Sequence, residues 1–242
     1  MQKAKIYSSK ANYYDLIYGG KDYQKETQLI YQTISKYKKS KGKELLDVAC
    51  GTGNHLKYFV DFYTCEGIDI NSELIEIAAN KVPNAIFMKA DMLNFNLQKK
   101  YDIITCLFSA IGYTKTLNNL RKVLKNFYFH LKNGGVVLIE PWFTKESKDF
   151  RVSVPFVVHN ENDNTKISRI SIASIKNNIS IMDTHYLVDE AGKGISHFSE
   201  KHILGLFEKN EFIKVMIEVG FKTKFLEEGI SKEGRGLYVG VK

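Results

Sequence analysis

Short apolar runs alternate with amphipathic stretches along the first 140 residues or so. The runs have the length and composition of buried strands, and they lie at residues 44–49, 64–70, 84–91, 101–110 and 135–142. Before and between them, apolar positions recur at helical spacing, in residues 22–39, 53–62, 71–82 and 116–132. This alternation predicts an α/β fold with a mostly parallel sheet and helices on both of its faces.

Residues at the ends of two amphipathic stretches predict where their helices begin and end. Ser72, with Glu73 and Glu76 close behind, has the pattern of a capping box. The Asn-Gly-Gly run at 133–135 is a typical helix stop, so the helix over 116–132 is expected to end there. The run that follows is apolar, which predicts an inner strand of the sheet.

The pattern changes after Trp142. Residues 151–206 contain period-two, β-branched stretches between Asn-, Asp- and Gly-rich turns, which predict an inserted antiparallel sheet. A helix over 208–219 with Gly220 as its stop, then strands at 221–226 and 235–241, resumes the α/β pattern. We therefore expect three parts, namely N-terminal helices and an α/β core (1–142), an inserted sheet (143–206) and the completion of the core (207–242).

Composition adds few constraints beyond a globular core. The 242 residues are 44% hydrophobic, which suits one large domain or a core domain with an insertion. There is no 18-residue apolar run and no apolar segment near residue 1, so we expect neither a membrane partner nor a secretory signal. Three cysteines without a CxxC pair argue against a disulfide framework or a metal site. A cytoplasmic protein without a metal is expected.

The formal net charge of +8 raises nucleic acid as a partner. The basic residues are scattered, however, and the densest cluster, KYKKSKGK at 36–43, precedes a strand as a solvated helix end would. A lysine-rich surface with no nucleic-acid partner is the favoured interpretation.

The candidate cofactor site follows the first predicted strand, in LLDVACGTGNHLKYF at 45–59. A glycine-rich turn before a helix presents backbone N–H groups to a ligand. Leu56 stands where a dinucleotide fingerprint has its third glycine, and the lysine of a phosphate loop is absent. Both phosphate-binding hypotheses are therefore weakened.

Acidic residues close the neighbouring strands. Asp47 ends the first strand, and Asp69 ends the second at the spacing where an acid holds ribose hydroxyls. Asp91 follows the third, where it can accept a hydrogen bond from an adenine amino group while Met92 packs on the ring. LFSAIGY at 107–113 would form the floor under the transferred group. Three acids without a clustered base suit a cationic ligand that lacks phosphate, such as S-adenosyl-L-methionine (SAM).

The series LLDVACGTGNH, GIDI, KADM and LFSAIGY resembles the motifs of class I SAM-dependent methyltransferases. Four further segments resemble the N,N-dimethyltransferases of nucleotide-linked 3-amino-3,6-dideoxy sugars, namely YYDLIYGGKDY (13–23), IEPW (139–142), HFSEKHILGLF (197–207) and EGRGLYVGV (233–241). The resemblance covers nearly the whole chain. It implies a Rossmann-like fold with a seven-stranded sheet, SAM as cofactor, a dTDP-linked amino sugar as substrate and a homodimer.

The strand-end pattern and the resemblance together give the expected site residues. Cofactor contacts are expected from Tyr14, Tyr23, Asp47, Ala49, Gly51, Gly53, Asn54, His55, Asp69, Ile70, Asp91, Met92, Leu107 and Phe108. Substrate contacts are expected from Trp142, Arg169, His185 and Arg235. Arg235 stands between two glycines, where its guanidinium can hold a diphosphate in two hydrogen bonds. Other interpretations stay open: a tight corner for the glycines, helix capping for Asp91 and His55, packing for the tyrosines, and solvated cations for Arg169 and His185.

Methyl transfer from a sulfonium is an in-line displacement, so the main task of the enzyme is to hold the acceptor nitrogen against the methyl group. Tyr113 is the first candidate to hydrogen-bond that nitrogen, and Tyr7 is the second. An ordinary tyrosine has a pKa of about 10, which favours orientation of the amine over base catalysis.

Three other functions stay open at the level of sequence. A nucleobase methyltransferase fits the charge but would carry a [DN]PP[YF]-type stretch where this chain has LFSAIGY. A methyltransferase for another small amine or hydroxyl fits the core motifs equally well. A binding module that has lost catalysis is disfavoured by the intact acids and glycines.

Overall fold

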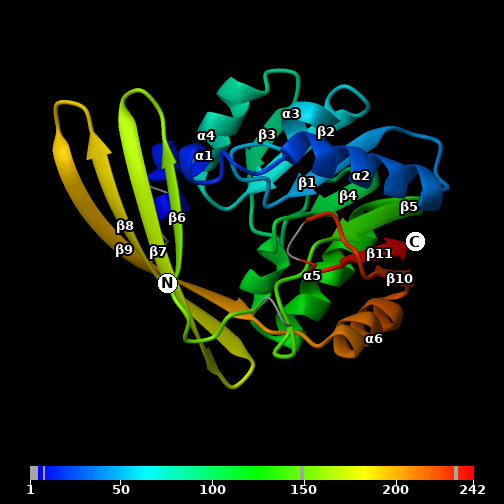
Figure 1. Cartoon of the computed structure of the whole chain (residues 1–242). Coiled ribbons are helices and arrows are strands. Elements are labelled where there is room, and N and C mark those ends of the chain that lie inside the picture. Colours follow the sequence, from blue (N-terminus) through cyan, green and yellow to red (C-terminus); the bar gives the residue numbers. More distant parts are fainter. Residues whose placement is uncertain (1–4, 8, 148–149, 232–233) are drawn as a thin grey trace.

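The computed structural model describes residues 5–7, 9–147, 150–231 and 234–242. Glu233 of the C-terminal motif therefore lies outside the described residues. The described chain forms two sheets, a large one covered by helices and a small one that stands beside it (Figure 1). No helix in these ranges is long and apolar enough to cross a membrane.

Seven strands of the described chain form the large sheet, and the bounds of these strands follow the predicted apolar runs. They are β1 (Glu44–Val48), β2 (Thr64–Asp69), β3 (Ile86–Lys89), β4 (Tyr101–Cys106), β5 (Leu131–Ile139), β10 (Lys222–Leu226) and β11 (Leu237–Val241). Their spatial order is β10-β11-β5-β4-β1-β2-β3, with β11 antiparallel to its neighbours β5 and β10 and the other pairs parallel. The strand order reverses between β1 and β4, which is where open α/β sheets bind their ligands.

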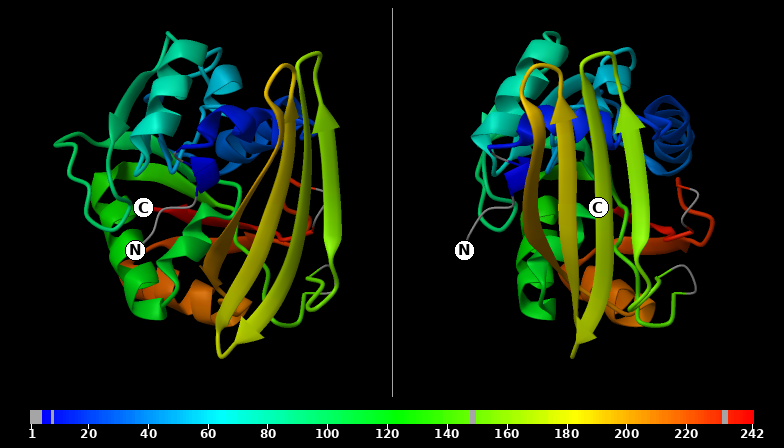
Figure 2. Two further views of the ribbon diagram at one scale, coloured as in Figure 1. Left: turned by 90° about the vertical axis from the view of Figure 1, so that its left-hand side faces the viewer. Right: turned by 60° about the vertical axis from the view of Figure 1, so that its left-hand side comes forward.

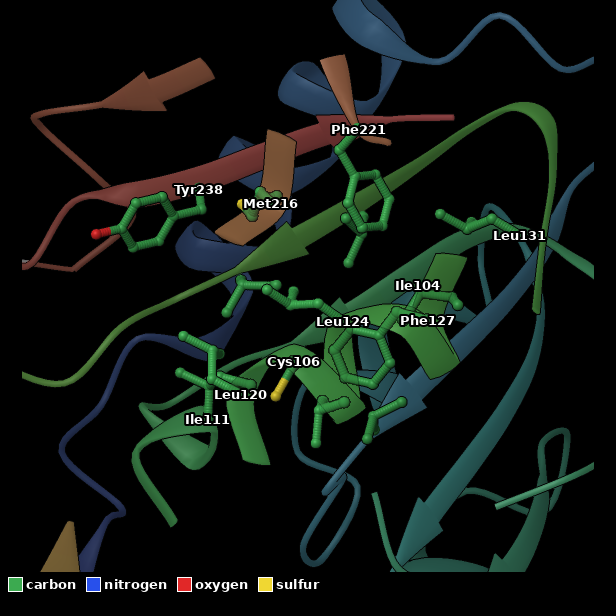
Figure 3. Packing of buried hydrophobic residues seen from close by; sticks show 14 of the residues in the cluster. Ile104, Cys106, Ile111, Leu120, Leu124, Phe127, Leu131, Met216, Phe221 and Tyr238 are labelled. Carbon is green, nitrogen blue, oxygen red and sulfur yellow. The ribbon is translucent and has the colours of Figure 1, made fainter. Parts of the chain in front are cut away.

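Helices cover both faces of this sheet. One face carries α2 (Tyr23–Tyr37), α3 (Leu56–Phe59) and α4 (Ser72–Lys81), and the other carries α5 (Leu117–His130) and α6 (Lys209–Val219). The amphipathic pattern explains this arrangement, because each helix buries its apolar stripe on the sheet. Figure 3 shows the second face, where Leu124 and Phe127 of α5 pack with Met216 of α6 against Ile104 of β4.

The small sheet is antiparallel and lies between β5 and α6 in the sequence. It consists of β6 (Phe156–Glu161), β7 (Thr165–Lys176), β8 (Ile179–Glu190) and β9 (Gly194–Gly205) in that spatial order. Figure 2 shows it as an upright layer with one broad face turned away from the rest of the molecule. All four strands fall within the predicted insertion.

The N-terminal segment packs between the two sheets. It contains the 3₁₀ turns η1 (Lys5–Tyr7) and η2 (Ala11–Tyr13) and the short helix α1 (Tyr14–Ile17). Ile6, Tyr13 and Ile17 form one buried cluster with Tyr186 of β8 and Phe198 of β9. The segment thus joins the inserted sheet to the α/β core.

Three local expectations were wrong. The helix predicted over 53–62 is reduced to α3, four residues long. Asn71 rather than Ser72 is the N-cap of α4, and the Ser72 hydroxyl bonds Glu73 instead of the backbone. Helix α5 ends at His130, because Leu131 already pairs with Tyr101 and the Asn-Gly-Gly run belongs to β5.

Candidate active site

A cavity of about 430 Å³ opens at the carboxyl ends of β1, β2 and β4. Residues of the N-terminal segment, the α/β core and β9 line it. Of the residues expected to contact the cofactor, all but Gly53 line the cavity, and Tyr7 and Tyr113 line it too. Three separate parts of the chain therefore assemble this cavity.

The glycine loop forms one wall of the cavity. The φ angle is +60° at Ala49 and +57° at Gly51, a region that favours glycine. A Cβ added to Gly51 would meet only the Tyr14 hydroxyl, at 3.9 Å, so the loop leaves open space at this point. A Cβ on Gly53 would instead meet Ala78, at 3.3 Å, and further apolar side chains. Gly53 therefore serves close packing beneath the loop and does not face the cavity.

Asp69 ties the loop to the end of β2. Its Oδ2 accepts a hydrogen bond from the Gly51 N–H at 3.1 Å, and its Oδ1 accepts one from the Asn71 N–H at 2.9 Å. Burial raises its pKa despite these bonds. Ile70, beside it, is half exposed at the rim of the cavity.

Asp91 and Asp47 occupy the ends of two further strands. Asp91 accepts a hydrogen bond from the Leu93 N–H at 2.9 Å and stands next to Met92 on the cavity wall. Asp47 is almost fully buried, and its Oδ1 accepts a hydrogen bond from the Thr105 hydroxyl at 2.7 Å. Burial raises the pKa of Asp47 to about 6, because ionisation is unfavourable away from water.

The N-terminal segment covers the loop and is hydrogen-bonded to it. Asp15 of α1 accepts hydrogen bonds from Thr52 at 2.6 Å and from Asn54 at 3.0 Å, and it pairs with Lys81 of α4 at 2.6 Å. His55 is buried beside Glu26 of α2, with 2.9 Å between Nε2 and Oε2. Asn54 is thus held in place by α1 and His55 by α2.

Tyrosines of the N-terminal segment and of the first position of α2 cover the cavity. We call these parts of the chain, from η1 to Tyr23, the lid. The Tyr7 ring lies 5.9 Å from the ring of Tyr14, and the ring of Tyr23 lies 5.0 Å from that of His55. Burial raises the pKa of all three hydroxyls, so they stay protonated and act as hydrogen-bond partners.

Tyr113 lies on the 3₁₀ turn η3 (Ala110–Thr114) and takes part in a chain of hydrogen bonds that the sequence did not reveal. Its hydroxyl is 2.9 Å from that of Tyr7 and 2.8 Å from Nδ1 of His202 on β9. Nε2 of His202 is in turn 2.9 Å from Oε1 of Glu200. A faint signal was present, since the buried face of HFSEKHILGLF carries a glutamate and a histidine between Phe198 and Leu204.

The floor of the cavity is held by a buried ion pair. Leu107 and Phe108 follow β4, and the Phe108 N–H donates to Oε2 of Glu140 at 2.6 Å. Oε1 of Glu140 is paired with the Arg235 guanidinium at 2.7 Å, with both side chains buried. Burial opposes ionisation of Glu140, yet the charge of Arg235 holds its pKa below the usual range.

The four expected substrate residues lie outside the cavity lining in the described structure. Arg235 is engaged with Glu140. Arg169 donates to the Tyr18 hydroxyl at 2.9 Å on the inner face of the small sheet. Trp142 packs on Phe143 with ring centroids 4.8 Å apart. His185 is on the outer face, 3.0 Å from His197, so it points away from the cavity.

Comparison with known proteins decides the family. The family model described as "Methyltransferase domain" matches residues 20–215, which include the glycine loop and all four strands of the inserted sheet. The chain belongs to the methyltransferase family. This methyltransferase is 36% identical over 235 residues to the dTDP-3-amino-3,4,6-trideoxy-alpha-D-glucopyranose N,N-dimethyltransferase of Streptomyces venezuelae, covering 96% of this chain and 97% of the relative.

Two solved structures share the methyltransferase architecture over its whole length. Streptomyces venezuelae DesVI superposes with a TM-score of 0.89 at 34% identity, covering 96% of this chain and 98% of that one. SAM-bound CalS10, an amino pentose methyltransferase of Micromonospora echinaspora, superposes with a TM-score of 0.83 at 26% identity. That match covers 100% of this chain and 98% of CalS10. The Rossmann-like fold with its inserted sheet is thereby confirmed.

Proposed function

We propose that this methyltransferase uses SAM to methylate the amino group of a dTDP-linked amino-dideoxy sugar. The observation that carries the cofactor assignment is the ring of Asp47, Asp69 and Asp91 around the open space beside Gly51. The substrate class is supported by the full-length similarity to the Streptomyces venezuelae enzyme, whose name states such a substrate.

The donor set of the cavity fits SAM. Carboxylates suit its cationic groups and its ribose hydroxyls. A phosphate at the glycine loop would instead face Asp47, Asp69 and Asp91, because the lining lysines, Lys115 and Lys201, follow η3 and lie on β9. The open space at Gly51 admits a ligand against the loop backbone. When bound, SAM supplies a methyl group that is electrophilic because it sits on a sulfonium.

Each acid has a distinct role in this proposal. Asp47 would balance the positive charge at the amino-acid end, Asp69 would hold the ribose, and Asp91 with Met92 would hold the adenine. The rest of the cofactor-binding surface would come from the glycine loop, the end of β2 and the residues after β4, namely Ala49, Gly51, Asn54, His55, Ile70, Leu107 and Phe108. Tyr14 and Tyr23 would cover the cofactor from the lid.

Tyr113 and Tyr7 would hold the acceptor amine. Their hydroxyls lie 2.9 Å apart on the cavity wall, so they can fix an amine nitrogen from one side. Orientation of this kind lowers a barrier by roughly 7–11 kcal/mol. Because burial raises the pKa of Tyr113, the residue works as a neutral hydroxyl rather than a phenolate.

A substrate-binding role is still a hypothesis for the four residues that lie outside the cavity lining, namely Trp142, Arg169, His185 and Arg235. The Arg235 guanidinium would have to exchange its contact with Glu140 for a diphosphate. The inserted sheet is proposed to cover the sugar nucleotide through β9, whose Lys201, His202 and Ile203 line the cavity.

The test is incubation of the purified protein with SAM and with dTDP-3-amino- and dTDP-4-amino-dideoxyhexoses, followed by mass spectrometry. One or two mass increments of a methyl group on one of the sugars are expected. The position of the amine follows from which sugar reacts. Binding of SAM by calorimetry with no transfer to either sugar would favour a different small amine or hydroxyl as acceptor.

A Tyr113→Phe variant tests the acceptor side. A fall in kcat with an unchanged Kd for SAM is expected. Full kcat over about pH 6–9 would remove Tyr113 from the proposed role, because the hydroxyl would then contribute nothing to the transition state.

We also propose that the protein acts as a homodimer in the cytoplasm. Apolar side chains on the outer face of the small sheet support the dimer, because Val157, Ile170, Leu187 and Ile195 are between 44% and 77% exposed. The free thiols of Cys50, Cys65 and Cys106 suit a reducing compartment.

A further inference from the structure

We propose that Glu200 and His202 of the inserted sheet, acting through Tyr113, form a proton relay that takes the proton released by the acceptor amine. The inference rests on the proposed function and deepens it. In this proposal the inserted sheet does more than cover the substrate, because two of its side chains take part in proton transfer.

The direction of the hydrogen bonds follows from Glu200. Burial opposes its ionisation, but hydrogen bonds from His202, Tyr186 and the Ile6 N–H hold its pKa below the usual range, so it is a carboxylate. A carboxylate only accepts hydrogen bonds. Nε2 of His202, 2.9 Å from Glu200, therefore carries a ring proton, and the relay begins with the imidazole in its neutral form.

The opposite ring nitrogen is then an acceptor. Nδ1 of His202, 2.8 Å from the Tyr113 oxygen, accepts the phenolic proton of Tyr113. With its proton committed to His202, the Tyr113 oxygen can accept two hydrogen bonds. Tyr7 can supply one, at 2.9 Å. The remaining lone pair is available to an N–H group of a ligand in the cavity.

The proton balance of the step is simple. An ammonium N–H proton moves to the Tyr113 oxygen while the phenolic proton moves to Nδ1 of His202. The amine gains a free electron pair, Tyr113 ends neutral, and His202 ends as an imidazolium beside the Glu200 carboxylate. The imidazolium later returns its proton through the Tyr113 hydroxyl to water that enters the cavity when the product leaves. After each methyl transfer, the methylated ammonium can lose its proton along the same route.

Burial makes this route preferable to a tyrosinate base. The raised pKa of Tyr113 shows that a phenolate is strongly disfavoured in this site. In a concerted relay the phenolate never forms, because the hydroxyl accepts one proton as it releases another. The arrangement is that of a carboxylate–histidine pair that orients and activates a third group, as in hydrolase triads.

Burial separates the relay from bulk water. His202 is 3% exposed, and the Glu200 side chain is 4% exposed. Among the described residues, the titratable and charged groups that face the relay are Tyr7 from η1, Tyr14 and Tyr18 from α1 and its C-cap, Tyr186 from β8, and Lys115 and Lys201 from the cavity wall. Burial raises the pKa of Tyr7, Tyr14 and Tyr186, so these hydroxyls stay neutral near pH 7.

The test compares kcat, its pH dependence and SAM affinity among single and double variants. For His202→Gln we expect kcat to fall by roughly 100-fold at neutral pH, within the usual range for acid–base catalysis. The pH profile of kcat should differ between the wild type and this variant, because the amine of the variant must lose its proton without the relay. Glu200→Gln should give a smaller fall, and the Kd for SAM should stay unchanged in both.

A double variant separates the relay from a merely structural role. Tyr113→Phe combined with His202→Gln should be no slower than Tyr113→Phe alone, because both residues act on one proton. Multiplied losses would overturn the relay. His159→Gln is the matched control, since His159 is an exposed histidine on the outer face of the same sheet. It should retain the wild-type kcat and pH profile.

A measurement that needs no substrate keeps the two proposals apart. Nitrogen-15 NMR of labelled protein should show His202 protonated at Nε2 and unprotonated at Nδ1. A proton on Nδ1 would overturn the relay whatever the substrate is. If wild type methylates neither amino sugar, the proposed function fails. If wild type is active and His202→Gln keeps full kcat with the same pH profile, only the relay fails.

Discussion

Oγ1 of Thr52 lies 2.6 Å from Oδ1 of Asp15, so the glycine loop is hydrogen-bonded to the first helix of the lid. Asp15 also bonds Asn54 and Lys81. Residues from three elements thus meet at one carboxylate. Since Gly51 lies next to Thr52, opening of the lid should disturb the cofactor wall.

Asp15→Ala should weaken SAM binding by roughly tenfold, because the closed lid would become a minor state and apparent affinity scales with the competent fraction. Calorimetry measures the Kd, and hydrogen exchange of residues 11–23 should speed up in the same variant. Asp163→Asn, an exposed acid in the turn after β6, is the control and should change neither. If hydrogen exchange speeds up while the Kd for SAM stays unchanged, lid opening does not weaken cofactor binding and the prediction is wrong.

Asp47→Asn should stabilise the cofactor-free protein and weaken SAM binding at once. The pKa of Asp47 in the fold, about 6, lies above its ordinary value of 3.8. The folded state therefore holds the extra proton between about pH 4 and 6. The folded protein loses stability as pH rises through this window, by roughly 3 kcal/mol in total.

Urea unfolding as a function of pH measures this effect. The stability gain of Asp47→Asn over wild type should be near zero at about pH 4 and should reach its full size above about pH 6. Asp102 is the contrasting site. Burial opposes its ionisation, but Lys132 at 2.8 Å and backbone N–H groups lower its pKa. Asp102→Asn should therefore lower stability at neutral pH, and a gain there would contradict the argument.

Arg235→Gln should destabilise the protein by about 3–5 kcal/mol, because it leaves the buried Glu140 carboxylate without its charged partner. The midpoint of urea unfolding checks this. Arg121→Gln removes the exposed pair with Glu218 and should cost less than about 1 kcal/mol. If Arg235→Gln is stable and instead raises the KM for the sugar nucleotide, the guanidinium serves the diphosphate as the sequence suggested.

Leu187→Lys should convert the proposed dimer to a monomer. Leu187 is 47% exposed on the outer face of β8, and a buried lysine at a subunit contact lacks compensation for its lost hydration. Light scattering at micromolar concentration measures the mass. A wild-type monomer under these conditions would refute the dimer directly. Lys176→Glu serves as a charge-change control, because Lys176 is exposed at the opposite end of β7 from Ser168, the residue that pairs with Leu187.

The sequence predicted the architecture well because the signals are local. Period-two and helical patterns identify elements one at a time, and strand ends in a parallel sheet share one edge. That is why Asp47, Asp69 and Asp91 were assigned together from their positions alone. The strands of the insertion were located by the same local rule.

The errors came from contacts that local patterns do not encode. The Asn-Gly-Gly run looked like a helix stop, but Leu131 pairs with Tyr101 and Gly134 accepts hydrogen bonds from Lys39 and Ser40. The partner of Tyr113 was missed because His202 lies 89 residues away. Arg235 appeared available for a ligand because nothing in the sequence places Glu140 beside it.

The walls of the cavity come from two parts of the chain, and this bears on how such enzymes can acquire new acceptors. The strand-end acids belong to the α/β core, whereas His202 and Glu200 belong to an insertion between β5 and α6. Under the proposed function, mutations in the inserted strands would therefore alter the acceptor side of the cavity without changing the strand-end acids. Exchange of residues 156–205 between relatives is a natural route to new acceptors, provided that Ile6 and Tyr13 of the recipient still match the incoming sheet.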